Sequence, residues 1–466
     1  RVWLDLAGRL PTTTEWRSYR DDTEDDKRVR LIDRLLETSD FANYWALKWA
    51  NTLAIDSKSL QSEGAEAYHA WLAEQFRNDT PWNQSAMEML TAEGDSYVNG
   101  PANFSRTGNG PDGIAESATR IFMGVRLRCA NCHDHPLDHW SQDDYHGLAA
   151  VFAKLKRGRV VGVAQRGEVT HPVTGQPAIP RIPGTRDLGA DADGRLEFAN
   201  WVTAPSNPYF ARAAVNRIWG HLMGRGIIDP VDDIRATNPA SHPQLIDSLA
   251  QRFSDNGFRF KSVIRLICNS RAYGRSSRTV TGNESDTKYY SHFLPRTLEA
   301  EVVANAIAEV TGVSIQYGVG NESGGSGDLP SDAIRLTDNR TVSETLDVLG
   351  RCDRTVACET PGQGSGSLAK VLHFLNGAIP TDRLNSKDGS LAKWLDQEQD
   401  DTKLVEFIYE TALTRRPSQA EQFFWKAQLT EAKEDSGNWR DRESRNEFFV
   451  DLAWGLLSSE TFLTNH

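Results

Sequence analysis

The chain has 466 residues, of which 39% are hydrophobic and 25% are charged, and its formal net charge at pH 7 is −12. This length is enough for two or three domains with a sizeable core, and the composition is typical of a globular protein. The acidic balance argues against a nucleic-acid partner, because a duplex-binding surface needs an excess of Lys and Arg to displace counterions. No run of about 18 apolar residues is present, so we expect no membrane span.

The first 160 residues are predicted to form a helical domain. Thr12 and Glu15 have the spacing of a capping box at a helix start. Apolar residues recur at helical spacing over 28–54, which predicts one or two amphipathic helices. A further helix is expected over 114–128, directly before a pair of cysteines, and helical spacing resumes over 143–155.

The region 161–195 is rich in Gly, Pro, Val and Arg, and its β-like runs predict a hairpin and a linker. The remaining residues, 196–466, are predicted to form a second helical domain. The fold class is therefore mainly α, a multi-helical two-domain protein with a small β-hairpin and linker region between the domains. The second domain is expected to contain helices over 196–225, 243–254, 259–269, 296–311, 367–376, 402–413, 418–433 and 443–464.

The two ends of the chain contain a weak internal repeat. A Pro-Thr-x-x-Glu sequence at 11–15 matches Pro-Ser-x-x-Glu at 417–421, and LIDRLLETSDF at 31–41 resembles LAWGLLSSETF at 452–462. Each copy reads as a capped helix followed by a Leu-Leu helix and then a Phe. We interpret the repeat as a duplicated helical hairpin, which is a structural feature and carries no function.

The sequence CANCHDHP at 129–136 concentrates potential metal ligands. Cys129, Cys132 and His133 form C-x-x-C-H, the attachment signal of c-type haem. In such a site the two thiols form thioethers to the haem vinyl groups, and the adjacent imidazole becomes an axial iron ligand. Composition alone gives roughly 10⁻³ chance matches to this signature. The motif therefore predicts one covalent haem c.

Zinc is the alternative cofactor at this motif. Cys129, Cys132, His133 and His135 are all suitable ligands, but four ligands within seven residues strain tetrahedral geometry. Structural zinc sites usually take two pairs of ligands from separate segments, and Cys352 with Cys358 would be a second pair of unusual spacing. A disulfide between Cys129 and Cys132 without any cofactor is a third alternative. The spacing favours haem.

The polar residues after the motif have two interpretations. A carboxylate or imidazole such as Asp134 or His135 can tune an axial ligand or carry protons. The same residues, with His139, can equally cap the turn before the next helix. The sixth haem ligand is left open, since no local signature distinguishes the remaining histidines or the four methionines, Met87, Met89, Met123 and Met223.

A second group of candidate residues lies in VNRIWGHLMGRG. Arg217, His221 and Arg225 recur every four residues and share one helical face, which could bind an anionic substrate or a haem propionate. The alternative is a helix salt-bridged to the acidic residues at 229–233. With His135, we take Arg217 and His221 as candidate substrate-binding or proton-transfer residues.

The segment FMGVRLRCANCHDHPLDHWSQDDYHGLAAVFAKL (122–155) resembles the first of the paired domains of unknown function found in planctomycetes, which often follow a separate planctomycete cytochrome c domain. The segment NPYFARAAVNRIWGHLMGRGIIDPVDDIRATNPASHPQLIDSLA (207–250) is similar to the start of the second. Its later signatures are ICNSRAYGRSS (267–277), CETPGQGSGSLAKVLHFLNG (358–377) and ALTRRPSQAE (412–421). The resemblance covers nearly the whole chain and implies a mainly helical, exported protein with a haem-type motif. The matching positions are Cys129, Cys132, His133, His135, Pro136, Asn216, Arg217, His221, Gly224, Arg225, Asp232, His242, Cys358, Glu359, His373 and Asn376.

One departure from the family concerns the cysteines. The family commonly shows Cys-Glu-Cys-Glu-Arg, whereas this chain has Cys358-Glu359-Thr360-Pro361-Gly362, and Cys352 stands where Pro is usual. A Cys352–Cys358 disulfide would replace the missing pair, as an oxidising periplasm permits. Cys268 and His373 lie in apolar helical patterns and are interpreted as core residues.

These observations lead to one functional hypothesis and two alternatives. The leading hypothesis is a periplasmic c-type haem oxidoreductase that passes electrons from a carbohydrate or carbohydrate-derived substrate to a redox partner such as a cytochrome. The carbohydrate follows from the family resemblance and from no residue spacing. The alternatives are a non-enzymatic electron-transfer cytochrome and a zinc-stabilised binding or scaffold module.

Overall fold

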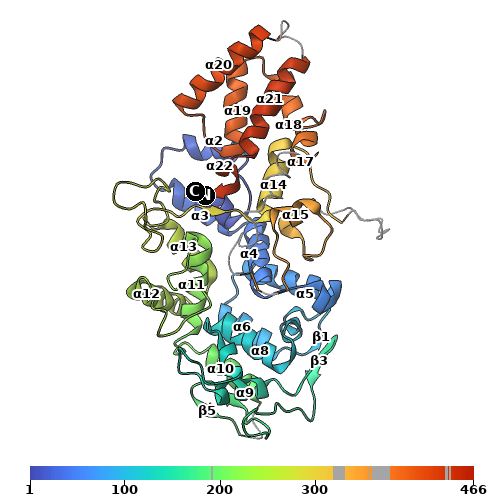
Figure 1. Ribbon diagram of the computed structural model, residues 1–466, viewed down its shortest axis with the longest axis vertical. Coiled ribbons are helices and arrows are strands. Elements are labelled where there is room, and N and C mark those ends of the chain that lie inside the picture. The colour runs from blue at the N-terminus through green and yellow to red at the C-terminus, as the bar shows by residue number, and fades with distance from the viewer. Residues whose placement is uncertain (190–192, 319–330, 356, 359–377, 436–438, 440–441) are drawn as a thin grey trace.

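The computed structural model describes residues 1–189, 193–318, 331–355, 357–358, 378–435, 439 and 442–466, and helices form most of it (Figure 1). The mainly α prediction is confirmed. In the first 160 residues lie α1 (Val2–Leu6), α2 (Thr13–Asp21), α3 (Lys27–Leu36), α4 (Ser39–Thr52), α5 (Ser57–Arg77), α6 (Trp82–Thr91), α7 (Phe104–Thr107), α8 (Gly110–Ala118) and α9 (Gln142–Val151), with the short helices η1 (Gly100–Asn103), η2 (Thr119–Met123) and η3 (Leu127–Asn131).

The later part of the chain follows the same helical pattern. It contains α10 (Gly194–Val202), α11 (Phe210–Met223), α12 (Pro243–Asp255), α13 (Phe260–Asn269), α14 (Ala300–Thr311), η4 (Ala333–Arg335), α15 (Glu344–Leu349), α17 (Ala378–Leu384), α18 (Ser390–Gln397), α19 (Asp401–Leu413), α20 (Gln419–Asp435), α21 (Arg442–Leu457) and α22 (Glu460–Leu463). The predicted helix over 367–376 lies outside the described residues.

The strands of the described residues are short and pair in small antiparallel groups. The strands β2 (Leu155–Arg157) and β3 (Val160–Val163) form a hairpin, to which β1 (Gly94–Asp95) adds a third strand in the order β1-β3-β2. The register pairs Leu155 with Val163. Two further pairs are β4 (Arg181–Ile182) with β5 (Arg186–Asp187), and β6 (Arg296–Thr297) with β7 (Thr464–Asn465).

Several predicted helices are shorter than the apolar spacing indicated. The predicted helix over 196–225 is wrong in its middle, where the chain leaves α10 and starts α11 only at Phe210. Pro205 and Pro208 lack the N–H that a helix interior needs. The side-chain oxygen of Asn207 then accepts the N–H groups of Tyr209 and Phe210 at 2.9 and 3.1 Å, which starts the new helix.

The internal repeat is visible as two sets of matching helix caps. Thr12 and Glu15 form the predicted capping box, and Ser418 and Glu421 make the same two reciprocal hydrogen bonds. In each copy an arginine six residues before the glutamate, Arg9 or Arg415, pairs with that glutamate through both of its terminal nitrogens. Further along, the N-cap side chains of Thr38 and Ser459 accept the N–H of the Phe three residues on. The sequence repeat therefore encodes repeated local geometry.

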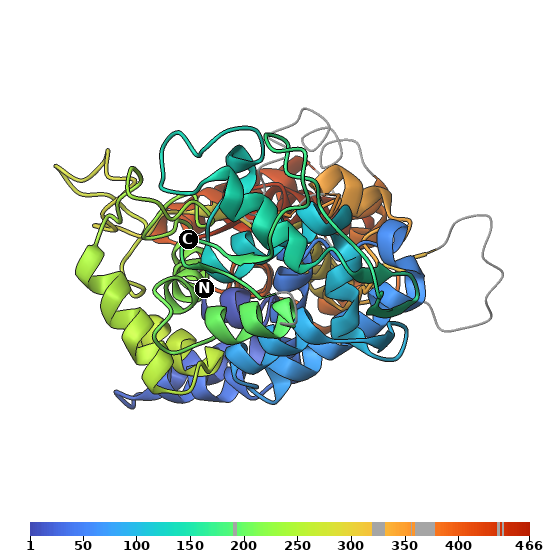
Figure 2. The same ribbon diagram turned by 90° about the horizontal axis from the view of Figure 1, so that it is seen from below.

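Contacts between distant parts of the chain hold the two ends together. Figures 1 and 2 both show the N- and C-termini side by side. There the buried carboxylate of Asp5 accepts hydrogen bonds from Tyr273 Oη at 2.6 Å and Asn465 Nδ2 at 2.7 Å, and it also contacts Arg296. The predicted domain bounds, 1–160, 161–195 and 196–466, stay a prediction, but polar and apolar contacts link α1 and α4 to the later helices.

Aromatic side chains from both parts of the chain share one core. Trp49 packs against Trp82 with ring centroids 4.3 Å apart and against Phe260 of α13 at 5.5 Å. Trp45 also contacts Phe260, at 6.4 Å, and both tryptophans are fully buried. Large aromatic rings contribute much of the apolar area that stabilises a helical core. Among the described residues no helix has the length and apolar character needed to cross a membrane.

Candidate functional site

The C-x-x-C-H motif follows a helix that is stopped by glycine. The chain runs through α8 and the single π-turn η2 and then reverses at Gly124, whose φ is +67°. A side chain there would meet the Ile234 side chain at 2.7 Å, so a residue other than glycine would be strained twice. The Gly124 carbonyl accepts the Ile234 N–H at 2.8 Å. The segment around residue 234 therefore fixes the approach to the motif.

Cys129 in the short helix η3 and Cys132 directly after it expose their thiols to solvent, while other residues of η3 are held by α9. Ala130 is fully buried, whereas Cys129 and Cys132 are exposed free cysteines. Asn131 lies between them, and its side-chain nitrogen donates to Tyr145 Oη at 3.2 Å. Its carbonyl oxygen accepts from His146 Nε2 at 3.0 Å. The two thiols are therefore accessible side chains on an anchored turn.

The imidazole of His133 has the tautomer that an axial ligand needs. Its Nδ1 lies 2.8 Å from the carbonyl oxygen of Asp134. A carbonyl can only accept, so Nδ1 donates this hydrogen bond, and in the neutral imidazole the lone pair is then on Nε2. The residue is exposed, and Nε2 makes no hydrogen bond with any described residue. An Nδ1–H donated to a backbone carbonyl is the usual way in which a protein orients a metal-binding histidine.

The polar residues after His133 form the turn that leads to α9. The imidazole Nδ1 of His135 accepts the backbone N–H of Leu137 at 3.2 Å. The backbone N–H of His135 donates to the Trp140 carbonyl at 2.7 Å. Asp134 accepts the N–H of Gln142 at 2.9 Å. Asp138 binds the indole N–H of Trp140 at 3.0 Å. The contacts of the two aspartates correspond to the capping interpretation, and His135 is the part-exposed imidazole of this turn.

Arg217 and His221 are buried in the core. Arg217 is 1% exposed and donates to the carbonyls of Ile121 and Arg120 at 3.1 and 3.2 Å, at the end of the helix that leads to the cysteines. His221 packs edge-on against Trp45. Burial, together with Lys48 and Arg217, holds the pKa of His221 well below its usual range, so the imidazole is neutral at neutral pH.

The structure does not gather the three candidate residues at one place. None of the hydrogen bonds or ring contacts of His135 runs to Arg217 or His221 in the described part of the chain. Arg225 lies beyond α11, which ends at Met223 before the left-handed Gly224, so it does not share the helical face of Arg217 and His221. It pairs with Asp229 at 3.3 Å, as the salt-bridge interpretation expects. Arg217 is thus placed to position the end of η2, and His135 is the candidate nearest to the thiols.

The residues present fit a covalent haem better than a closed zinc site. Two exposed thiols three residues apart and a histidine with a free Nε2 are the donor set of a c-type attachment. A zinc site would need three or four ligands that converge on one point. Within the described residues, no group of three His, Cys, Asp or Glu side chains converges in this way. Three of the four methionines, Met89, Met123 and Met223, are buried.

A second cysteine pair is oxidised in the structure. Cys352 and Cys358 form a disulfide, while Cys268 is a buried thiol whose pKa is raised to about 12 by burial. The disulfide loop docks on the end of α4, where the Asn51 carbonyl accepts the Cys358 N–H at 3.1 Å. Arg354, inside the loop, is buried and donates to Asn51 Oδ1 at 2.8 Å. Glu359, His373 and Asn376 lie outside the described residues.

Sequence reasoning missed the residues that hold the motif in place. Tyr145 and His146 anchor Asn131 from α9, and Tyr145 Oη also donates to Glu116 Oε1 at 2.8 Å. The available signal was their position in the first turns of a helix with a Ser141 cap. That position predicts proximity to the preceding loop but does not identify the atoms that meet.

Comparison with known proteins identifies two family models in the chain. Residues 1–157 match the model PSCyt2, described as a protein of unknown function (DUF1549). Residues 194–428 match PSD1, described as a protein of unknown function (DUF1553). No curated protein and no solved structure matches the chain. The chain therefore belongs to the family of paired planctomycete-type PSCyt2 and PSD1 domains of unknown function.

Proposed function

We propose that this chain is an exported redox protein that carries one covalent haem c on Cys129 and Cys132, with His133 as an axial ligand. The observation that carries the proposal is the combination of two exposed free thiols with an imidazole whose Nδ1–H is held by a backbone carbonyl. Haem bound there would supply one-electron chemistry. The chain's own part is to fix the thiols on η3 and to orient His133.

The surface position of the motif favours electron exchange with a partner protein. Cys129, Cys132 and His133 are all exposed, so a group attached to them would have an edge accessible from outside. An electron-transfer role needs such an edge, whereas catalysis at the iron needs a substrate pocket closed against water. Of the two redox hypotheses, the geometry supports best an electron-transfer cytochrome whose partner is another redox protein.

The oxidoreductase hypothesis stays a proposal, with fewer candidate residues for proton transfer. His135 is part-exposed beside the motif and could transfer a proton, whereas Arg217 and His221 are buried. We therefore retain His135 as the candidate proton-transfer group and assign Arg217 to positioning. A carbohydrate or carbohydrate-derived substrate is a proposal that rests on the family resemblance.

The proposed compartment is the periplasm or another exported location. The Cys352–Cys358 disulfide supports it, since structural disulfides form and persist mainly in oxidising compartments. Covalent haem attachment requires the same compartment, because both cysteines must meet haem after export.

The proposal is tested by a visible spectrum and a pyridine haemochrome assay on protein exported in cells with cytochrome maturation. We expect stoichiometric haem in the native chain and its loss in a Cys129→Ala/Cys132→Ala variant. Cys268→Ala is the matched control, because Cys268 is also a free cysteine but is buried. Equal haem content in all three proteins would contradict the assignment, and a colourless protein with stoichiometric zinc would favour the zinc module.

The two redox hypotheses differ in the state of the iron. A six-coordinate low-spin haem that no small ligand displaces indicates an electron carrier. A haem that binds added cyanide or nitric oxide at an open position indicates catalysis. In that case, His135→Gln should alter the pH dependence of turnover without changing the haem content.

A further inference from the structure

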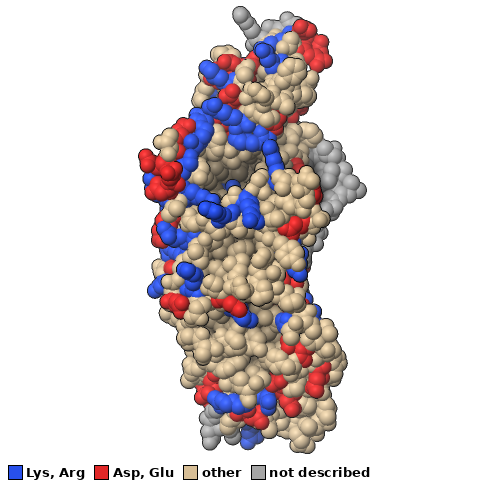
Figure 3. Space-filling model, turned by 90° about the vertical axis from the view of Figure 1, so that its left-hand side faces the viewer, with Lys and Arg blue, Asp and Glu red and all other residues tan. Residues whose placement is uncertain are grey.

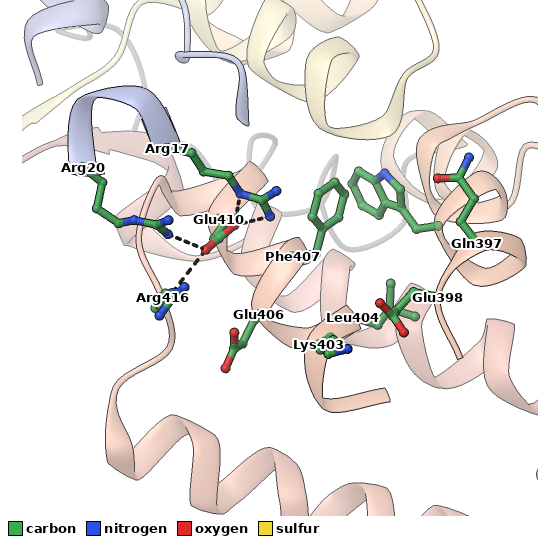
Figure 4. Close-up of a pocket in the computed structure, with 11 residues that line it drawn as sticks. Arg17, Arg20, Gln397, Glu398, Lys403, Leu404, Glu406, Phe407, Glu410 and Arg416 are labelled. Carbon is green, nitrogen blue, oxygen red and sulfur yellow. Dashed lines mark hydrogen bonds and ion pairs between the residues drawn. The ribbon is translucent and has the colours of Figure 1, made fainter. Parts of the chain in front are cut away.

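A buried carboxylate in the C-terminal helices collects three arginines. Glu410 of α19 has a side chain that is only 4% exposed. Arg17 donates to its Oε2 through Nε at 3.0 Å and Nη2 at 2.7 Å. Arg20 and Arg416 approach its Oε1 at 3.2 and 3.3 Å (Figure 4). Two of these arginines come from α2 and one follows α19, so the cluster joins segments almost 400 residues apart in sequence.

The three guanidinium groups carry more donors than the carboxylate uses. Arg20 spends two further N–H groups on Asp21, at 2.7 and 2.9 Å. Nη1 of Arg17 and both terminal nitrogens of Arg416 donate to no described residue. A single charge would need one guanidinium, since a bidentate pair already satisfies a carboxylate. With Glu410 and Asp21 as the two carboxylates, the three arginines carry one positive charge more than their partners, with planar donors left over.

These donors border a cavity of about 530 Å³. Aromatic rings line the same cavity, where Phe407 and Trp394 meet edge to face with their ring centroids 4.7 Å apart. Both rings are part-exposed. Figure 4 shows Phe407 beside Arg17, whose guanidinium carbon is 5.5 Å from the centre of the Phe407 ring. Gln397 and Glu406 also line the cavity and can accept hydrogen bonds from hydroxyl groups.

The cavity is lined by four basic side chains, those of Arg17, Arg20, Lys403 and Arg416, and by three acidic ones, those of Glu398, Glu406 and Glu410. Figure 3 shows Lys and Arg gathered around a hollow in the upper part of one face, whereas the whole chain has a net charge of −12. In Figure 1, α2 and α19 belong to this upper end, and α9, which packs on the cysteine-bearing η3, lies near the lower end. The cavity is therefore separate from the motif at Cys129.

We propose that this cavity binds a small carboxylate that carries a ring. The acid group would pair with the free guanidinium donors of Arg17 and Arg416, and the ring face would lie on Phe407 and Trp394. Sugar acids and aromatic acids share this chemistry, and a volume of this size accommodates either. The site is independent of the haem proposal and gives the chain a ligand-recognition function at the end remote from the cysteines.

The test is isothermal titration of the full chain with D-glucuronate, benzoate, inorganic sulfate and D-glucose. We expect saturable binding of at least one ring acid, weaker binding of sulfate and none of glucose. Arg416→Gln should weaken the ring acid about tenfold, as expected when one charge-assisted hydrogen-bonding group is lost. Phe407→Leu should weaken the ring acid severalfold and leave sulfate unchanged. Added salt should weaken binding.

Arg442→Gln is the matched control. Arg442 is an exposed arginine of the same helical region, and it pairs with Asp396 at 3.3 Å outside the cavity. Thermal unfolding checks that each variant is folded, and Arg416 is suited to replacement because its side chain is 58% exposed. Binding of glucuronate alone identifies a sugar-acid site, and binding of benzoate alone identifies an aromatic-acid site. Absence of saturable binding by both acids, equal binding of sulfate, or the same loss in Arg442→Gln would overturn the proposal.

Discussion

The buried ion pair between Lys48 of α4 and Glu299, the N-cap residue of α14, links the two family regions. It gives a quantitative prediction for the stability of the protein. Lys48 is 3% exposed and pairs with Glu299, which is 13% exposed and also accepts from Tyr44 Oη at 3.0 Å. Burial alone would raise the pKa of Glu299, but Lys48 and Arg296 outweigh it and lower the pKa from 4.5 to about 2. The difference corresponds to about 3 kcal/mol of stability.

The sign of the pH dependence follows from the lowered pKa. A carboxylate whose folded-state pKa is depressed contributes its full stability above its unfolded pKa and loses it as the pH falls through the folded value. The contribution of Glu299 should therefore be complete above about pH 5 and should decline between pH 4.5 and about 2.

Lys48→Met removes the cation and leaves the buried carboxylate. We expect the free energy of unfolding at pH 7 to fall by about 3–5 kcal/mol, because an uncompensated buried charge is strongly destabilising. The deficit should shrink as the pH is lowered, since a protonated Glu299 no longer needs Lys48. Urea unfolding followed by far-UV circular dichroism measures both effects, and the Lys48→Met/Glu299→Gln double variant should regain part of the loss.

Lys58→Met is the control for this series, because Lys58 is exposed on α5. Its effect should be within about 0.5 kcal/mol of zero. A Lys48→Met protein as stable as the Lys58→Met protein would refute the view that α4 and α14 are held by this pair. A deficit that grows as the pH falls would refute the assigned direction of the Glu299 pKa.

Three further predictions concern elements of both family regions. Replacement of Cys352 and Cys358 by Ser should lower the free energy of unfolding by about 2 kcal/mol, a modest loss because the loop that the disulfide closes is short. Unfolding of the native and the variant protein with and without reductant measures this loss. An equal response of the native and the variant protein to reductant would contradict the prediction. Thr12→Ala and Ser418→Ala should each cost about 1 kcal/mol by loss of a capping box, and unequal losses would show that the two copies of the repeat differ in strength. Gly124→Ala should reduce the thermal stability of the chain by more than Gly158→Ala, since only Gly124 combines a positive φ with a close neighbour.

Local features of the fold were predictable from the sequence. The capping-box spacing predicts two helix starts, at Thr12 with Glu15 and at Ser418 with Glu421. The C-x-x-C-H spacing identifies the candidate site from the sequence alone. The break between α10 and α11 was also present as Pro205 and Pro208. The sequence analysis predicts one continuous helix there, because the helical spacing of apolar residues continues across both prolines.

Long-range pairs were not predictable. Nothing in the sequence near Glu410 indicates Arg17 or Arg20, and nothing near Asp5 indicates Tyr273 or Asn465. Such pairs depend on how helices pack, and helical periodicity fixes only which face of a helix is buried. The same limit applies to Arg217, whose role as a substrate-binding residue stays a prediction. Its four-residue spacing with His221 is correct, but that face of α11 points into the core.

The haem attachment at Cys129 and Cys132 is the central claim, and peptide mass spectrometry tests it most directly. Protein exported in cells with cytochrome maturation is digested, and the mass of the peptide containing residues 129–133 is measured in the native chain and in the Cys129→Ala/Cys132→Ala variant. We expect the native peptide to carry one covalently bound haem and the variant peptide to carry none. A native peptide with two unmodified thiols, or with a Cys129–Cys132 disulfide, would contradict the account.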